Sequence, residues 1–128
     1  SLVIYLRVLR RQQGLMISGF LQTIAVAVLS DQSHVSVQAE IYRRRLENLI
    51  HLLGMAGIEA TFPDGGFYLW VRAPSGDAWE LARFLAEVAG IVVCPGELFG
   101  TGGSHYVRIA AVGTDEKLGL VKERLDLL

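Results

Sequence analysis

The sequence predicts an α+β fold, in which a small antiparallel or mixed sheet carries helices on one face and is preceded by long helices. Apolar residues recur with a helical period up to Gly57 and then with a period of two. From Ile58 onward the predicted order is strand, strand, helix, strand, strand, helix, which is typical of this class. The 128 residues are 52% apolar and 20% charged, which suffices for one packed domain of ordinary size.

Two helices are predicted at the start of the chain. Residues 2–13 form an apolar face and an arginine-rich face, and Gly14 ends this helix. After a loop at residues 16–19, the run 21–29 is apolar nearly all round, so a helix there must be covered on most sides. Because the chain opens at Ser1 inside an apolar run, we expect a fragment of a longer protein.

The uncharged stretch 12–30 superficially resembles a secretory signal or a membrane span, because three arginines precede it. Another apolar segment lies upstream of those arginines, and Ser18, Gln22 and Thr23 interrupt the run. A crossing helix needs about 20 mostly apolar residues. A buried helix is the better interpretation.

A long helix is predicted to run to about Ala56, with Asp31 and Ser33 as capping residues. Arg43 and Glu47 form an i,i+4 pair on its wet side. The apolar residues that recur at spacings of four, three and four are Tyr42, Leu46, Leu49 and Leu53.

A pair of strands follows this helix. Residues 58–62 alternate apolar and polar, and the next four residues, Pro63-Asp64-Gly65-Gly66, are turn formers. In residues 67–72 one face carries Phe67, Leu69 and Val71, and the other carries Tyr68, Trp70 and Arg72.

The capping box of Asp77 and Glu80 predicts a helix that ends at Gly90. Its apolar positions follow the i, i+3, i+4, i+7 pattern in Leu81, Phe84, Leu85 and Val88.

The remaining segments are a short buried strand at 91–94, a glycine-rich loop at 95–104 and a strand at 105–111. Thr114 then caps a last helix. The residues that this helix turns inward are Leu118, Val121, Leu125 and Leu128.

The charge balance and the single cysteine exclude several classes of function. Twelve basic and thirteen acidic residues leave a net charge of −1, which provides no field for nucleic acid or an anionic membrane. Cys94, the single cysteine, cannot form an internal disulfide or a structural zinc site. A reducing compartment follows, and we expect the cytoplasm.

Several patterns that suggest chemistry have a simpler structural interpretation. Gly96, Gly100, Gly102 and Gly103 are followed by a strand and no lysine, so they predict a flexible loop shaping a cleft and not a phosphate loop. Cys94 and His105 could be a nucleophile and its base, but Cys94 ends an Ile-Val-Val-Cys run typical of a buried hydrophobe.

Other polar and aromatic residues also favour structural roles. His34 and His51 have no carboxylate at metal-ligand spacing and are interpreted as surface residues, so no metal site is predicted. The run Arg43 to Arg45 points in three directions and predicts a solvated helix face. Trp70 and Trp79 could stack a ligand but more often pack.

Arg108 is the candidate binding residue. It stands in the middle of Tyr106-Val107-Arg108-Ile109-Ala110, an otherwise uncharged strand, and therefore needs an anion. One possibility is an ion pair with an acid such as Glu97. The other is a bidentate clamp on a ligand carboxylate, for which the guanidinium geometry is suited.

Three ordered motifs resemble the C-terminal domain of class I/II pyridoxal-phosphate aminotransferases. They are Gly65 to Trp70, then Gly90 to Gly96 with Phe99-Gly100, then Tyr106 to Ala110. Upstream segments extend the resemblance to nearly all of the chain. Within the family, the sequence is most similar to succinyldiaminopimelate aminotransferases of lysine biosynthesis. This similarity lies in the spacing of Asp31, His34, Gln38 and Tyr42 and in the aromatic Tyr68-Leu69-Trp70.

The resemblance implies that residues 1–32 are the end of a large domain and its connection, and that residues 33–128 are the small domain. It also implies a homodimer, amino acid and 2-oxo acid substrates, and Arg108 as the arginine that holds the substrate α-carboxylate. The family's Schiff-base lysine and phosphate-binding groups belong to the large domain. Lys117 and Lys122 match no such motif, so we expect no catalytic or cofactor-binding residue here and no bound pyridoxal phosphate.

One alternative remains open from the residues. The chain could be a free-standing α+β module in which Arg108 binds a small carboxylate without catalysis.

Overall fold

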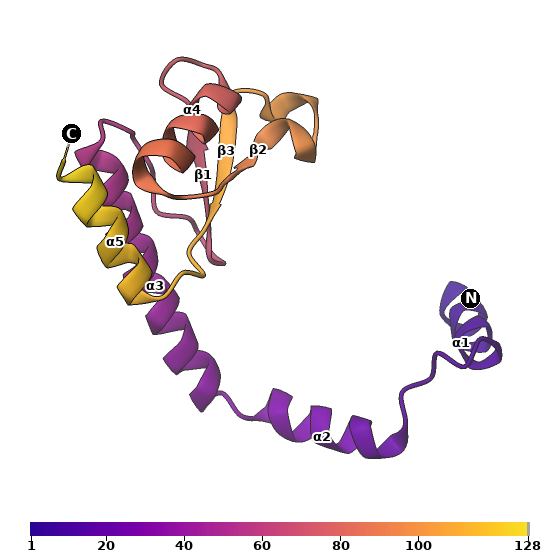
Figure 1. Ribbon diagram of the computed structural model, residues 1–128. Helices are drawn as coiled ribbons and strands as arrows, with labels where there is room; N and C mark the ends of the chain where they lie inside the picture. The colour runs from indigo at the N-terminus through magenta and orange to yellow at the C-terminus, as the bar shows by residue number, and fades with distance from the viewer. Residues whose placement is uncertain (128) are drawn as a thin grey trace. The chain divides into compact units, whose positions relative to one another are not determined.

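The computed structural model describes residues 1–127. The chain divides into two compact units, Ser1–Val37 and Gln38–Leu128, and each is described by itself (Figure 1). The helix α3 (Ser33–Met55) begins in the first unit and continues in the second.

The first unit is helical and contains no buried residue. Helix α1 (Leu2–Gln12) and helix α2 (Gly19–Ser30) confirm the two helices predicted there. The second helix begins earlier than its apolar run, because the Ser18 side chain accepts a hydrogen bond from the Leu21 N–H and caps it.

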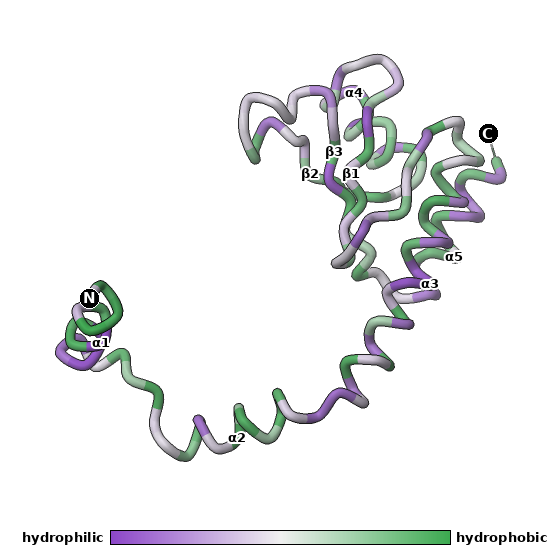
Figure 2. The backbone as a smooth tube through the Cα atoms, turned by 180° about the vertical axis from the view of Figure 1, so that it is seen from behind, coloured by the Kyte–Doolittle hydropathy of each residue, from purple (hydrophilic) through white to green (hydrophobic). Residues whose placement is uncertain are grey.

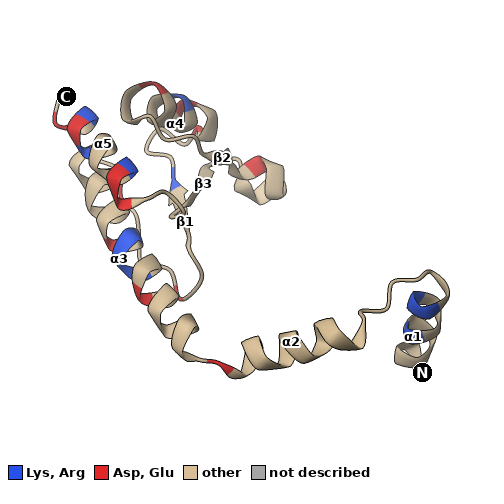
Figure 3. Ribbon diagram, turned by 60° about the horizontal axis from the view of Figure 1, so that its bottom comes forward, with Lys and Arg blue, Asp and Glu red and all other residues tan. Residues whose placement is uncertain are grey.

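Helix α2 presents apolar side chains on all sides. Phe20 is 75% exposed and Leu29 is 76% exposed. Figure 2 shows the hydrophobic colour along much of this helix, and Figure 3 shows no charged residue on it. Among residues 1–127, no helix combines the length and hydropathy that a membrane crossing requires. A helix of this composition requires a covering partner.

The start of α3 is fixed by Asp31. Its Oδ1 accepts hydrogen bonds from the Ser33 N–H at 2.9 Å and the Ser33 hydroxyl at 2.6 Å, and its Oδ2 lies 3.0 Å from His34 Nδ1. The Ser33 hydroxyl, followed by His34, lowers the pKa of Asp31. The predicted cap is therefore confirmed.

The second unit is built on a three-stranded antiparallel sheet with the order β1-β3-β2. Strand β1 (Tyr68–Arg72) pairs with β3 (Tyr106–Ala110), and the short β2 (Cys94–Pro95) pairs with the other edge of β3. Side chains alternate between a buried and an exposed face along β1, as predicted.

The α-helices of this unit contribute to one core on the buried face of the sheet. Helix α4 (Ala78–Phe84) continues as a π-helical turn (Leu85–Ala89) and crosses in front of the strands in Figure 1. Helices α3 and α5 (Asp115–Leu125) add further apolar side chains. The largest fully buried members are Leu46, Leu52, Leu53, Leu69, Leu85, Ile109, Val71 and Val107. The predicted α+β class with helices on one face is confirmed.

Side-chain caps begin the last two helices as predicted. The Asp77 carboxylate accepts from the N–H groups of Trp79 at 2.8 Å and Glu80 at 3.3 Å. The Thr114 hydroxyl accepts from the Lys117 N–H at 3.4 Å. Leu118, Val121 and Leu125 are buried as predicted, and Leu128 lies outside the described residues.

One predicted strand is wrong, and another is shorter than predicted. Residues 58–62 form no ladder, because the Ile58 N–H instead donates to the Leu53 carbonyl and closes the end of α3. The predicted strand 91–94 shrinks to Cys94–Pro95, because Gly90 ends the preceding helix in the left-handed region and the Ile91 N–H bonds back to Leu85.

The three consecutive arginines of α3 are only partly a solvated face. Arg43 pairs with Glu40 and with the predicted partner Glu47. Arg44 and Arg45, however, both bind the carboxylate of Asp115 in the first turn of α5, at 2.7 and 3.1 Å. These two arginines therefore link α3 to α5.

We expect Asp115→Asn to lower the melting temperature at pH 7 by a few degrees at most, because the ion pairs are exposed. The arginines, Arg45 first, hold the pKa of Asp115 below its usual value of 3.8. A carboxylate whose pKa is lower in the folded than in the unfolded state stabilises the fold at pH values above its unfolded-state pKa. This contribution is lost as the pH falls through the folded-state pKa. The wild-type advantage should therefore shrink below about pH 4.

Thermal unfolding followed by circular dichroism between pH 3 and pH 7 measures this difference. Glu116→Gln is the matched control, because it removes a charge from the same helical turn. An equal shift in both variants would mean that the helix dipole, and not the arginines, accounts for the effect.

Candidate functional site

The face of the sheet opposite the core carries the candidate site. Strand alternation places Tyr68 and Trp70 of β1 and Tyr106 and Arg108 of β3 on this face. We call these four residues, with Phe99 from the loop beside them, the open face. Trp70 and Cys94 flank Arg108 in register on the two neighbouring strands.

The guanidinium of Arg108 contacts two aromatic rings. Its carbon is 4.4 Å from the centroid of the Tyr68 ring and 4.2 Å from that of Phe99. Both distances fall within the range of a cation–π contact. The cation is therefore held by ring faces.

The ion pair considered for Arg108 is not formed. Glu97 instead accepts a hydrogen bond from the Trp79 indole N–H at 2.6 Å. Within residues 1–127, no carboxylate lies within salt-bridge distance of Arg108. The alternative of an internal partner at Glu97 is therefore wrong for this structure.

The aromatic residues of the open face also contact one another. Trp70 stacks on Tyr106 with centroids 5.6 Å apart and an interplanar angle of 17°. It meets Phe99 edge-on at 6.0 Å. Trp70 is still 45% exposed, so its packing leaves surface for a ligand.

The glycine-rich loop is folded into two 3₁₀ turns, Gly96–Phe99 and Thr101–Gly103. The backbones of Gly96 and Gly103 touch so closely that a β-carbon on either would collide with the other residue's backbone. A β-carbon on Gly96 would also come within 2.8 Å of the Trp70 ring. These glycines therefore place Phe99 against the open face, and strand β3 follows, as the sequence indicated.

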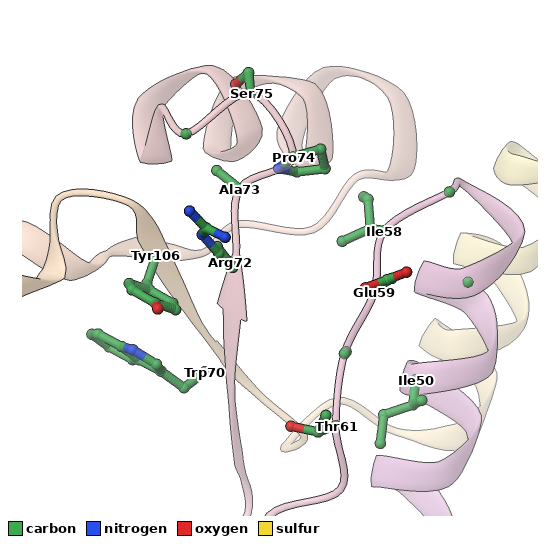
Figure 4. A pocket seen from close by; sticks show the side chains of 14 residues that line it. Ile50, Ile58, Glu59, Thr61, Trp70, Arg72, Ala73, Pro74, Ser75 and Tyr106 are labelled. Carbon is green, nitrogen blue, oxygen red and sulfur yellow. The ribbon is translucent and has the colours of Figure 1, made fainter.

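A groove of about 1200 Å³ adjoins the open face. Figure 4 shows Trp70, Tyr106 and Arg72 on its sheet side and the segment with Ile58 and Glu59 on the other. Arg108 is not among its lining residues. The groove meets the open face through Trp70 and Tyr106.

The remaining candidates do not assemble into a reactive group. His105 Nδ1 lies 2.6 Å from the Gly76 carbonyl, and Cys94, which is partly buried, is paired in register with Arg108. The expected burial of the run before Cys94 is partly wrong, since Val92 is 90% exposed. His51 is exposed on α3. Across the described residues, no cluster of three His, Cys, Asp or Glu could hold a metal ion.

The sequence singles out Arg108 as a candidate but does not indicate its contacts with Tyr68 and Phe99. The alternation of β1 places Tyr68 on the same face as Trp70, so its position was readable. The approach of Phe99 depends on the fold of the loop, for which the paired glycines are the one signal.

Comparison with known proteins gives a consistent result. The family model "Aminotransferase class I and II" matches residues 3–125. A probable aminotransferase of Mycobacterium tuberculosis is 36% identical over 98% of this chain, and an LL-diaminopimelate aminotransferase of Dehalococcoides mccartyi is 34% identical over 86%. The chain spans 29% and 30% of these two relatives.

A similar fold occurs in a solved aminotransferase from Neisseria meningitidis. The match covers 98% of this chain and 34% of that protein, with a TM-score of 0.82 and 28% identity.

Proposed function

This chain belongs to the aminotransferase class I and II family, and on that premise we propose that the protein containing it transfers an amino group between an amino acid and a 2-oxo acid. The observation that carries the proposal within this chain is the Arg108 guanidinium, which has aromatic contacts on the open face and no acidic partner among the described residues. Arg108 would hold the α-carboxylate of either substrate through two parallel hydrogen bonds.

The family's cofactor is pyridoxal phosphate, which when bound carries the amino group from one substrate to the other. The described residues of this chain do not fit it. Lys117 and Lys122 both lie on α5, and Lys122 Nζ is bound to the Asp126 carboxylate at 2.5 Å. Neither lysine is on the open face. We propose that the cofactor is held by another part of the protein.

We expect the 128-residue chain alone to form no covalent adduct with pyridoxal phosphate. Both lysines are exposed on α5, and neither lies in a motif that resembles the family's Schiff-base lysine. Borohydride reduction followed by mass spectrometry measures the adduct. A stoichiometric adduct on Lys117 or Lys122 would contradict this expectation.

The finer assignments extend this proposal. We propose residues 1–32 as the end of the large domain and its connection, and residues 33–128 as the small domain. The apolar surface of α2 supports cover by the large domain or by a second subunit of a homodimer. The single cysteine fits a cytoplasmic protein.

For the substrate we propose succinyldiaminopimelate with glutamate, in lysine biosynthesis. The motif spacing described above supports this choice, and relatives named LL-diaminopimelate aminotransferase support a diaminopimelate-type substrate.

The test is an assay of the full-length protein, loaded with pyridoxal phosphate, against a panel of amino donors with 2-oxoglutarate. We expect transfer from at least one donor, with N-succinyl-diaminopimelate among the best. Activity with other donors alone would contradict the substrate assignment. Carboxylate binding with no transfer for any donor would instead favour a binding module.

A further inference from the structure

We propose that Tyr68 and Phe99 are positioning residues that clamp Arg108 and form two walls of its carboxylate site. This inference rests on the proposed role of Arg108. The two rings come from different elements, β1 and the first 3₁₀ turn of the loop, and they meet at the same guanidinium.

The clamp explains how a cation can be held with its hydrogen-bond donors still available. A guanidinium carries five N–H donors in its plane, and an internal carboxylate would occupy two of them. Aromatic faces attract the cation through their quadrupole and contact its flat sides. The edge of the guanidinium thus remains the place where an incoming carboxylate binds.

Phe99 is held independently of Arg108. The close approach of Gly96 and Gly103 closes the loop, and Trp70 contacts the Phe99 ring edge-on. The hydrogen bond from Trp79 to Glu97 ties the same turn to α4. The position of this ring is therefore set before any ligand arrives.

Tyr68 is held by a second aromatic group. Its ring lies 4.4 Å from that of Phe67, which stacks on Tyr42 of α3 at 5.1 Å. Both walls are thus supported by neighbouring elements. Preorganisation of this kind lowers the ordering cost of binding a carboxylate.

The test is a double-mutant cycle in the full-length, pyridoxal-phosphate-loaded enzyme. We expect Phe99→Leu to raise KM for the amino acid and for the 2-oxo acid, since both carry the carboxylate, by roughly three- to thirtyfold. The turnover number kcat should change less than KM. Phe99→Tyr, which keeps a ring, should restore KM to within about twofold of wild type. Phe62→Leu is the matched control, because Phe62 and Phe99 are equally exposed, at 50%.

The coupling between the Phe99 and Arg108 substitutions distinguishes a clamp from a general structural role. It is the difference between the effect of the double variant and the summed effects of the two single variants. If Phe99 acts through Arg108, adding Phe99→Leu to Arg108→Ala should have no further effect on KM. Full additivity would overturn the clamp. An unchanged KM in Phe99→Leu would also overturn the clamp. If Arg108→Ala loses activity in that case, the proposed function still stands. An unaffected Arg108→Ala would overturn both the clamp and the carboxylate-binding role of Arg108, while the amino-group transfer that it retains would leave the proposed reaction standing.

A second measurement does not depend on activity or on the stability of a leucine variant. In the ¹⁵N-labelled full-length protein, ring currents from Tyr68 and Phe99 should move the Arg108 Nε–H resonance upfield of the other arginines. Phe99→His, with a smaller ring current, should reduce that displacement. An Arg108 signal at the ordinary position would contradict the clamp.

Discussion

Replacing Arg108 by alanine is expected to lower kcat/KM of the full-length enzyme by roughly thirtyfold to a few thousandfold. The estimate follows from the cost of about 2–5 kcal/mol for truncating one partner of a buried, hydrogen-bonded charge pair. In the alanine variant the substrate carboxylate would have no cationic partner. Arg83→Ala is the control, since Arg83 is an exposed cation on α4.

The lysine variant separates charge from geometry. Arg108→Lys keeps the positive charge but loses the planar fork, so its kcat/KM should fall between those of wild type and the alanine variant. Steady-state kinetics and thermal unfolding should be measured on the same samples. A kcat/KM within about threefold of wild type for Arg108→Ala, with unfolding several degrees earlier, would make Arg108 a structural residue.

Replacing Gly103 by alanine is expected to have the second large effect. Its β-carbon would collide with the backbone of Gly96, which has no side chain that can move away. Overpacking of this kind typically costs about 1–3 kcal/mol. The loop must shift to relieve the contact, so Phe99 should move away from Arg108 as well.

Gly102→Ala is a neighbouring control in the same turn, because a β-carbon there meets nothing within 4 Å. Chemical denaturation should show a lower free energy of unfolding for Gly103→Ala and little change for Gly102→Ala. Equal stability of the two variants would mean that the loop tolerates a wider separation of its ends.

The helices could be predicted because their signals are local. The side chains of Asp77 and Thr114 cap α4 and α5 by accepting hydrogen bonds from backbone N–H groups in the first turn of each helix. The spacing of Leu118, Val121 and Leu125 identifies the buried face of α5. The alternation in β1 likewise identified both faces of the sheet.

The strand wrongly predicted at 58–62 shows where a local pattern is insufficient. Residues 58–62 alternate as a strand does, but the Ile58 N–H is used to end α3, and no neighbouring strand pairs with the segment. Strand pairing depends on distant partners, which a period of two does not specify. The link from Arg44 and Arg45 to Asp115 joins residues about 70 positions apart and was hidden for the same reason.

The part of the candidate site that could be predicted from the sequence is Arg108. A lone arginine in the uncharged strand Tyr106–Ala110 indicated an anion. Its aromatic surroundings required the register of β1 with β3 and the closed loop that presents Phe99.

The most direct measurement is a crystal structure of the full-length, cofactor-loaded protein with its amino donor bound. We expect the two α-carboxylate oxygens to lie about 2.7–2.9 Å from two Arg108 guanidinium nitrogens, with Tyr68 and Phe99 still in contact with the guanidinium. A substrate carboxylate bound by another cation, with Arg108 paired to an acid of the protein, would contradict the proposed role of Arg108.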